Sequence, residues 1–363
     1  MYNLGTIGLG HWVKRLHHVI QQRDDLSLVK TVGTRAFDDK REELEQYGIS
    51  RDMYFQINPN DSIPNEFFDD TDIVHIASPN QFHKSQTIQS LENGKVTVTE
   101  KTFGVNREEF NDVINVIKRK NSKANVHLHY LSKALTKEFA KKLPSLIKEH
   151  GKITKITASF LEKKNEEDAR RKWLFKPENG GVFMDWIHPL TIISDVMKAD
   201  KFDLVSAKTF VLQPDYDMVN PTAVESEYKV KGNNFSDGNS LLIRVGKGSE
   251  FEHKAMRIYF ENAFVDLKYL NTEEEFLTGK RGDMIITENS KIIERISPAG
   301  PLSYEFMIQE MIKMVNGNNP ALTVDDIIKM YEPEWQFQEF SKDTRPTKDK
   351  NEIQKFIRDA LAH

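Results

Sequence analysis

The 363-residue chain contains no cysteine. This absence excludes disulfides, thiolate metal sites and cysteine nucleophiles. A long hydrophobic run is also missing, and the first apolar segment begins at once, without the charged and hydrophobic regions of a secretion signal. We therefore expect neither a signal peptide nor a transmembrane helix, and a cytoplasmic location is the simplest expectation.

A strong excess of charge of one sign is lacking as well. The formal net charge is −4, from 51 basic and 55 acidic residues that are interspersed along the chain. This balance provides no electrostatic footprint for nucleic acid or for an anionic membrane. The length exceeds that of one ordinary core, so we expect two domains.

The N-terminus carries a short apolar strand that runs into two glycines. A glycine permits a sharp turn at the strand end, and a second one lets a pyrophosphate approach the backbone N–H groups at the start of the next helix. The alternative is a glycine turn of some other α/β protein, because this spacing alone is common. We expect the following residues to bind a dinucleotide: Gly8, Leu9, Gly10, His11 and Trp12.

Strands and helices alternate over residues 1–125. Strands are expected at 27–33, 72–77, 96–99 and 124–128, and helices at 13–20, 37–48, 81–92 and 107–119. This order predicts an α/β Rossmann domain with a parallel sheet. Ligands of such sheets bind at the carboxyl ends of the strands. The residues expected there are Thr34, Arg35, Ser78, Pro79, Asn80, Glu100 and Lys101.

Arg35 indicates which dinucleotide is preferred. Domains that prefer NAD place an acidic residue after the second strand to hold the ribose 2′-OH, whereas an arginine accommodates the 2′-phosphate of NADP. The sequence after that strand is Gly33-Thr34-Arg35. We expect NADP to be preferred and NAD to be possible; the alternative is that Arg35 is an ordinary solvated residue.

The pattern changes over residues 126–363. Strands without intervening helices are expected at 153–161, 204–212, 226–230, 241–245, 254–260, 264–269 and 284–287, with helices at 135–149, 189–197 and 304–315. This series favours an α+β domain with a large, mainly antiparallel sheet. A capping box at Thr323–Asp326 predicts a further helix that ends before Pro333. Residues 341–349 are expected to form a mobile connector to a terminal helix.

Five pieces in register resemble the Gfo/Idh/MocA oxidoreductases. They are Gly8-Leu9-Gly10, Ser78-Pro79-Asn80-Gln81-Phe82-His83, Gly94-Lys95-Val96, Glu100-Lys101, and Gly180-Gly181 followed by Asp185 and His188. The resemblance implies hydride exchange between NAD(P) and a sugar or related hydroxyl compound. It also implies a C-terminal domain whose open sheet forms the interface of a homodimer or homotetramer, with C-terminal helices that pack back on the N-terminal domain.

The resemblance assigns roles by position. Ser78–Asn80 and His83 would lie near the cofactor, whereas Lys101 and His188 would face the substrate, with Asp185 beside them. The chemistry of these residue types agrees, because alcohol oxidation needs a base that titrates near neutrality, here His188, and a cation such as Lys101 to stabilise the alkoxide. Asp185 would order the imidazole or bind a second hydroxyl. The alternative for His188 is a hydrogen-bonded core histidine.

Two departures from the family pattern concern this site. Thr102 stands where the family has a proline, often preceded by a cis peptide. Because a cis bond before a non-proline residue costs about 3 kcal/mol, we expect a different local geometry at Lys101. The family also commonly separates the Asp and His by four residues, and here the separation is three.

A second, local resemblance concerns the substrate. Glu100–Gly104 and His129–Lys133 are similar to the E-K-P-F-G and H-Y-L-x-K motifs of glucose-6-phosphate dehydrogenases. It implies that His129, Tyr130 and Lys133 hold a sugar phosphate, the alternative being an ordinary strand end. Trp173 would pack on a sugar or nicotinamide face unless its loop is merely solvated. No metal is expected, because the first three histidines fit no compact metal site.

The sequence therefore favours an NADP-preferring dehydrogenase that acts on the CH–OH group of a sugar or sugar phosphate. Two other functions stay open: a non-catalytic NAD(P)-sensing regulator on the same scaffold, and a reductase of a dihydrodiol or bilin. The presence of both Lys101 and His188 argues against the regulator, because a sensor needs neither.

Overall fold

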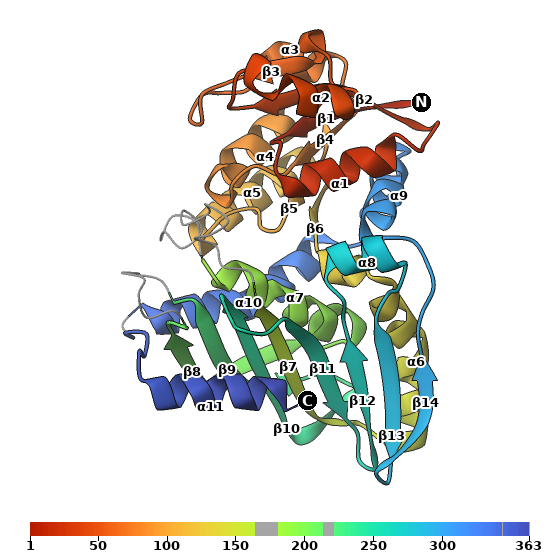
Figure 1. Cartoon of the computed structure of the whole chain (residues 1–363), viewed down its shortest axis with the longest axis vertical. Coiled ribbons are helices and arrows are strands. Elements are labelled where there is room, and N and C mark those ends of the chain that lie inside the picture. Colours follow the sequence, from red (N-terminus) through yellow and green to blue (C-terminus); the bar gives the residue numbers. More distant parts are fainter. Residues whose placement is uncertain (164–180, 213–220, 343, 363) are drawn as a thin grey trace. The chain divides into compact units, whose positions relative to one another are not determined.

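The chain divides into two compact units (Figure 1). A computed structural model describes residues 1–163, 181–212, 221–342 and 344–362. The first unit comprises Met1–Leu128 and Tyr304–Ile327, and the second comprises His129–Ser303 and Ile328–His363. The expected boundary after residue 125 therefore lies inside the last strand of the first unit.

The first unit is built on a parallel sheet with the strand order β3-β2-β1-β4-β5-β6. This order confirms the predicted Rossmann sheet. The strand order runs outward from β1 to β3 on one side and from β4 to β6 on the other, so it switches between β1 and β4. Open α/β sheets bind their ligands at such a switch point. The strands are β1 (Tyr2–Ile7), β2 (Leu26–Gly33), β3 (Tyr54–Gln56), β4 (Ile73–Ile76), β5 (Val96–Glu100) and β6 (Ala124–His127).

The core of the first unit includes a helix from late in the chain. Met307, Ile308 and Met311 are buried on one face of that helix, as their helical spacing predicts. They pack in one cluster with Leu4 of β1 and Ile73 of β4. The helices of this unit are α1 (His11–Ile20), α2 (Arg41–Gln46), α3 (Asn65–Asp69), α4 (His83–Glu92), α5 (Arg107–Lys120) and α9 (Ser303–Val315).

The second unit is built on an eight-stranded sheet with the order β14-β13-β12-β11-β7-β10-β9-β8. Every neighbouring pair is antiparallel except β7 and β10, so the prediction of a large, mainly antiparallel sheet is confirmed. The strands are β7 (Ile153–Glu162), β8 (Lys201–Phe210), β9 (Ala223–Lys231), β10 (Phe235–Lys247), β11 (His253–Tyr259), β12 (Ala263–Lys268), β13 (Asp283–Glu288) and β14 (Lys291–Ile296).

Pro144, Pro189 and Pro333 lie inside helices of this unit, the last two contrary to the expected helix bounds. The helix that was expected to start at Pro189 begins at Phe183, and the helix that was expected to end before Pro333 continues to Ser341. An internal proline costs about 3 kcal/mol, but Trp335 and Phe337 beyond Pro333 are fully buried and outweigh it. The helices are α6 (Ala134–His150), α7 (Phe183–Thr191), α8 (Thr272–Thr278), α10 (Val324–Ser341) and α11 (Lys350–Leu361).

The capping box that was expected to open α10 is confirmed. The Asp326 N–H donates to Thr323 Oγ1 over 3.1 Å, and the Thr323 N–H donates to Asp326 Oδ2 over 2.9 Å. These reciprocal bonds satisfy two backbone donors that the helix itself leaves without a partner. The local sequence signal therefore places the start of this helix correctly, although the position of its end depends on packing.

The C-terminal tail is anchored to the sheet rather than mobile along its whole length. The Thr347 N–H donates to the Thr209 carbonyl over 2.9 Å, and the Val211 N–H donates to the Thr347 carbonyl over 3.1 Å. Beyond it, α11 lies across β7, β8 and β9 (Figure 1) and buries Phe356 against Phe210. The helix therefore covers part of one face of this sheet.

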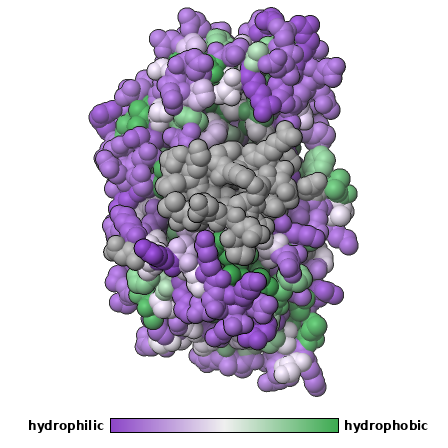
Figure 2. All heavy atoms as spheres, turned by 60° about the vertical axis from the view of Figure 1, so that its left-hand side comes forward, coloured by the Kyte–Doolittle hydropathy of each residue, from purple (hydrophilic) through white to green (hydrophobic). Residues whose placement is uncertain are grey.

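On the face that Figure 2 shows, the coloured residues are mainly hydrophilic, with hydrophobic residues scattered among them. This matches the 29% share of charged residues in the sequence. Within the described ranges, no helix combines the length and the apolar character that a membrane span requires.

Candidate active site

The glycine turn after β1 has the geometry of a phosphate-binding turn. Gly8 has φ +103°, and a Cβ there would lie 2.8 Å from the Ala77 backbone, so only glycine fits. Gly10 caps α1, and a Cβ on it would meet a single atom at 3.9 Å, which leaves open space beside the helix start. The first turn of α1, which begins at His11 and Trp12, contains no acidic residue. These features fit the pyrophosphate of a dinucleotide.

Thr34 and Arg35 follow β2, at the edge of the sheet where the glycine turn lies. Both are exposed. The Tyr54 hydroxyl donates to the Arg35 carbonyl over 2.7 Å, which fixes the main chain there. A Cβ on Gly33 would collide with the same hydroxyl, so a larger residue at this strand end would displace the Tyr54 side chain. The Arg35 guanidinium is therefore carried on an ordered turn at the solvent boundary.

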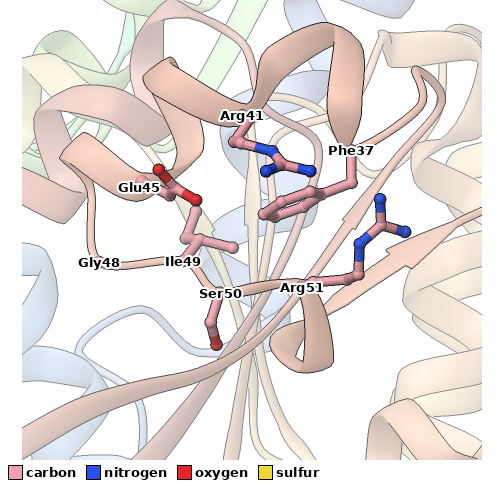
Figure 3. Close-up of a pocket in the computed structure, with 7 residues that line it drawn as sticks. All are labelled: Phe37, Arg41, Glu45, Gly48, Ile49, Ser50 and Arg51. Carbon is pink, nitrogen blue, oxygen red and sulfur yellow. The ribbon is translucent and has the colours of Figure 1, made fainter.

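A pocket of about 420 Å³ opens beyond this turn (Figure 3). Its two cations, Arg41 and Arg51, both pair with Asp38, and the Arg51 guanidinium lies 5.2 Å from the centroid of the Phe37 ring. Glu45 adds a negative charge, so these side chains offer no surplus of positive charge to a phosphate. The lining residues are Phe37, Arg41, Glu45, Gly48, Ile49, Ser50 and Arg51, and none of them is an expected site residue.

The loop after β4 carries Ser78, Pro79 and Asn80, which precede α4. His83 opens this helix, and its ring is almost fully buried. His83 Nε2 lies 2.8 Å from the Ser78 carbonyl oxygen, and Nδ1 lies 2.7 Å from the Thr102 carbonyl oxygen. His83 thus bridges two loops of the first unit.

Glu100 ends β5 and is enclosed by histidines. Its Oε1 atom lies 3.2 Å from His75 Nε2 and 3.0 Å from His127 Nδ1. Burial alone would raise the pKa of the carboxyl, but His127 and His75 outweigh it and hold the pKa well below its usual range. Glu100, an expected cofactor contact, is therefore ionised and held by these rings.

Lys101 follows Glu100 directly at the carboxyl end of β5. The Lys101–Thr102 peptide bond is cis although Thr102 is not a proline. The expectation of a different local geometry, which rested on the cost of such a bond, is therefore wrong. The Lys101 side chain is partly exposed.

In the second unit, Asp185 and His188 lie on one turn of α7. Asp185 Oδ1 is 3.8 Å from His188 Nε2, too far for a hydrogen bond. Asp185 Oδ2 is instead 2.6 Å from the ammonium of Lys247, at the end of β10. Both side chains of this ion pair are about one-tenth exposed. Asp185 is thus bound to a cation that the sequence analysis did not single out.

Tyr130 lies beside His188, with ring centroids 4.6 Å apart. The Tyr130 ring also contacts Phe160 and Tyr269 and is almost fully buried. Burial raises the pKa of the phenol, so it stays protonated and acts as a hydrogen-bond donor near neutral pH. Tyr130 and His188 therefore present two polar tips within one aromatic cluster.

A chain of charges extends from Asp185 along the strand ends. Lys247 lies 3.5 Å from Glu162, and Lys254 lies 3.2 Å from Glu162 and 2.8 Å from Glu252. Sequence reasoning missed these residues because their partners come from separate strands. The available signal was a lysine two residues after the expected strand 241–245.

The remaining expected substrate residues have mixed surroundings. His129 Nδ1 lies 2.8 Å from Ser303 Oγ. The Lys133 ammonium is fully buried, pairs with Glu275 at 2.7 Å and donates to the Leu270 carbonyl over 3.1 Å. This environment favours a structural role for Lys133 over the expected phosphate contact. Trp173 and Gly180 lie outside the described residues. Within the described part of the chain, no three His, Asp or Glu side chains are grouped as a metal site.

Comparison with known proteins supports the fold and the cofactor. The sequence model described as "Oxidoreductase family, NAD-binding Rossmann fold", which is that of the Gfo/Idh/MocA proteins, matches residues 2–128. Scyllo-inositol 2-dehydrogenase (NADP(+)) IolU of Bacillus subtilis is 31% identical over 121 residues. This stretch is 31% of this chain and 35% of that relative, so the chain aligns with about a third of its length.

Solved structures match nearly the whole chain at low identity. KijD10, a 3-ketoreductase from Actinomadura kijaniata in complex with NADP and TDP-benzene, has a TM-score of 0.75 at 14% identity, over 92% of this chain and 95% of that one. Aldose-aldose oxidoreductase from Caulobacter crescentus has a TM-score of 0.74 at 15% identity, over 99% and 98%. The two-unit fold is thus shared. Residues 2–128 thus match the NAD-binding Rossmann domain of the Gfo/Idh/MocA oxidoreductases.

Proposed function

We propose that the protein transfers a hydride between the nicotinamide of NADP and a hydroxyl-bearing carbon of a sugar or cyclitol. The observation that carries this proposal is the group of proton-handling side chains on and beside α7. His188 lies against Tyr130, and Asp185 lies beside it in an ion pair with Lys247. A dinucleotide-binding oxidoreductase needs such groups because hydride transfer from an alcohol must be accompanied by loss of the hydroxyl proton.

The cofactor is assigned to the first unit. We propose that the Gly8–Trp12 turn and the Ser78–Asn80 loop hold the dinucleotide, and that Thr34 and Arg35 bind the 2′-phosphate of NADP. An arginine suits this role because its guanidinium donates two parallel hydrogen bonds to phosphate oxygens. The nicotinamide, when bound, takes up or releases the hydride.

The substrate oxygen is assigned to Lys101 and His188. In the oxidative direction, His188 accepts the hydroxyl proton at a ring nitrogen, and the Lys101 ammonium stabilises the developing alkoxide. In the reductive direction, Lys101 polarises the carbonyl and His188 returns the proton. Tyr130 donates a hydrogen bond to a neighbouring hydroxyl, and His129 stands beside it on the same turn.

We propose a neutral sugar or cyclitol rather than a sugar phosphate. The ammonium of Lys133, which would hold a phosphate, is committed to Glu275. The relatives are compatible with a neutral ring, since one is named for scyllo-inositol and another for aldoses. We further propose a homo-oligomer that forms through the part of the eight-stranded sheet that α11 leaves uncovered.

The proposal is tested by the absorbance of reduced nicotinamide during incubation with NADP or NAD. The panel contains inositols, free aldoses, sugar phosphates, a dihydrodiol and a bilin. Turnover with an inositol or aldose is expected, and turnover confined to sugar phosphates, dihydrodiols or bilins would contradict the substrate class. Tight NADPH binding without any turnover would instead favour the regulator.

A further inference from the structure

The ring of His83 joins two loops that carry expected site residues. One nitrogen faces the carbonyl of Ser78, in the loop after β4, and the other faces the carbonyl of Thr102, in the turn after β5. Both distances are below 3 Å, and the ring is about 1% exposed. The ring therefore supports both loops through a single side chain.

The chemistry of the bridge makes it sensitive to the state of the ring. A carbonyl oxygen only accepts hydrogen bonds, and a neutral imidazole has a single N–H to donate. The neutral ring therefore bonds one carbonyl and turns a lone pair toward the other, whereas the protonated ring bonds both. Burial lowers the pKa of His83, and the two carbonyl contacts oppose that shift.

Lys101 lies between two anchored neighbours. Glu100 before it is held by His75 and His127, and the Thr102 carbonyl after it faces His83. The main chain at Lys101 is thus fixed from both sides, and the side chain of Lys101 leaves from the middle of this fixed turn. A shift of His83 would therefore move the point from which the Lys101 ammonium reaches out.

We propose that His83 is a positioning residue that couples the Ser78–Asn80 loop to the turn carrying Lys101. Binding of the dinucleotide at the first loop then orders the lysine at the second. This inference rests on the proposed function, which assigns the dinucleotide to Ser78–Asn80 and the substrate oxygen to Lys101. It adds that dinucleotide binding at the Ser78–Asn80 loop changes the position of Lys101 through the imidazole of His83.

The test measures Lys101 directly and needs no substrate. Full-length protein is treated with a limiting dose of an amine-acylating reagent, with and without NADPH at a saturating concentration for each variant. Acylation of Lys101 is read by peptide mass spectrometry, with Lys118 on α5 as the internal reference. In the unmodified protein, NADPH is expected to change the acylation rate of Lys101 by about 5-fold or more, the usual range for coupled sites.

His83→Leu is expected to abolish this effect of NADPH while the dinucleotide still binds, as measured by its fluorescence. His83→Gln, whose amide can donate to one carbonyl, is expected to recover part of it. His150→Leu is the matched control, because His150 is also buried and hydrogen-bonded, to Asn262, but lies outside both loops. This control is expected to keep the full effect. Thermal unfolding of each variant shows which of them are folded.

The outcomes separate the inference from the proposed function. An equal effect of NADPH on Lys101 in the unmodified protein and in folded His83→Leu or His83→Gln would overturn the coupling. So would the absence of any effect in the unmodified protein. Loss of the effect in His83→Leu without turnover on any substrate would leave the coupling standing and overturn the proposed reaction. Where turnover is found, kcat of His83→Leu is expected to fall by about 10- to 100-fold, as for a misplaced reacting group.

Discussion

Lys247 and Asp185 provide a sensitive test of the proposed base. The Lys247 ammonium lies 2.6 Å from Asp185 Oδ2, whereas His188 Nε2 lies 3.8 Å from Oδ1. In Lys247→Met the Asp185 carboxylate loses this ammonium, and the nearby imidazole can then offset more of its charge. Protonation of His188 is then favoured, so the unprotonated base is lost at a higher pH. The acidic limb of the kcat/KM profile is expected to move to higher pH.

The size of this shift follows from the distances. Two unit charges about 4 Å apart interact by about 4 kcal/mol at an effective dielectric constant of about 20. Since about 1.4 kcal/mol corresponds to one pH unit, the shift is at most about 3 units, and at least about 1 unit is expected. The same substitution removes the ammonium from a buried carboxylate, which costs about 3–5 kcal/mol of unfolding free energy. Glu162, at 3.5 Å from Lys247, also loses a partner, although Lys254 still binds it.

The assay is a kcat/KM profile between pH 5 and 9, together with denaturant unfolding. Lys247→Arg keeps the charge and is expected to leave the limb in place. The double variant Lys247→Met, Asp185→Asn removes both charges and is expected to return the limb toward its original position. An unshifted limb in folded Lys247→Met would refute the proposal that Asp185 acts electrostatically on His188.

Three further outcomes are expected. His188→Ala and Lys101→Ala should each lower kcat by about 10²- to 10⁴-fold, because each variant loses a proton-transfer or charge-stabilising group. The dissociation constant of NADPH, measured by fluorescence titration, should change little. Unchanged rates in both variants would contradict the site. Arg35→Ala should weaken NADPH binding by about 10-fold or more and leave NADH binding nearly unchanged in the same titration, as loss of a charge-assisted hydrogen bond requires. Burial, and His75 nearby, lower the pKa of His17 to about 3. Below an unfolded-state pKa of about 6.5, the unfolded chain therefore binds a proton that the folded chain does not bind. The free energy of unfolding then falls as the pH falls. His17→Leu should therefore flatten the acid dependence of the unfolding free energy between pH 6.5 and 3, by up to about 4–5 kcal/mol; an unchanged slope would contradict this account.

The first unit could be predicted from sequence because its information is local. The Gly8–Gly10 turn, the alternating strands and helices and the capping box of α10 each depend on residues close together in the chain. Asp185 and His188 could be placed on one helix turn for the same reason. The start of α7 could not be placed, because Pro189 suggested a boundary that the packing of the helix overrides.

The missed parts depend on partners that are distant in sequence. Lys247 meets Asp185 only because β10 ends beside α7, and Lys133 meets Glu275 only because α8 returns over the start of α6. The motif suggested a ligand-binding role for Lys133 because it contains the lysine but not Glu275, whose carboxylate pairs with it. At Thr102, the average cost of a cis bond was applied without knowledge of the surrounding contacts.

The position of α9 has a consequence for how the protein is made. This helix supplies buried methionines to the core of the first unit, yet it lies after the entire eight-stranded sheet in the sequence. When only residues 1–128 have emerged from the ribosome, the Rossmann sheet therefore has part of its apolar face uncovered. Such surface favours association with other chains until it is closed. We expect the nascent chain to depend on chaperones over this interval, and the first unit to be recovered as a separate protein only when a linker joins α9 to it.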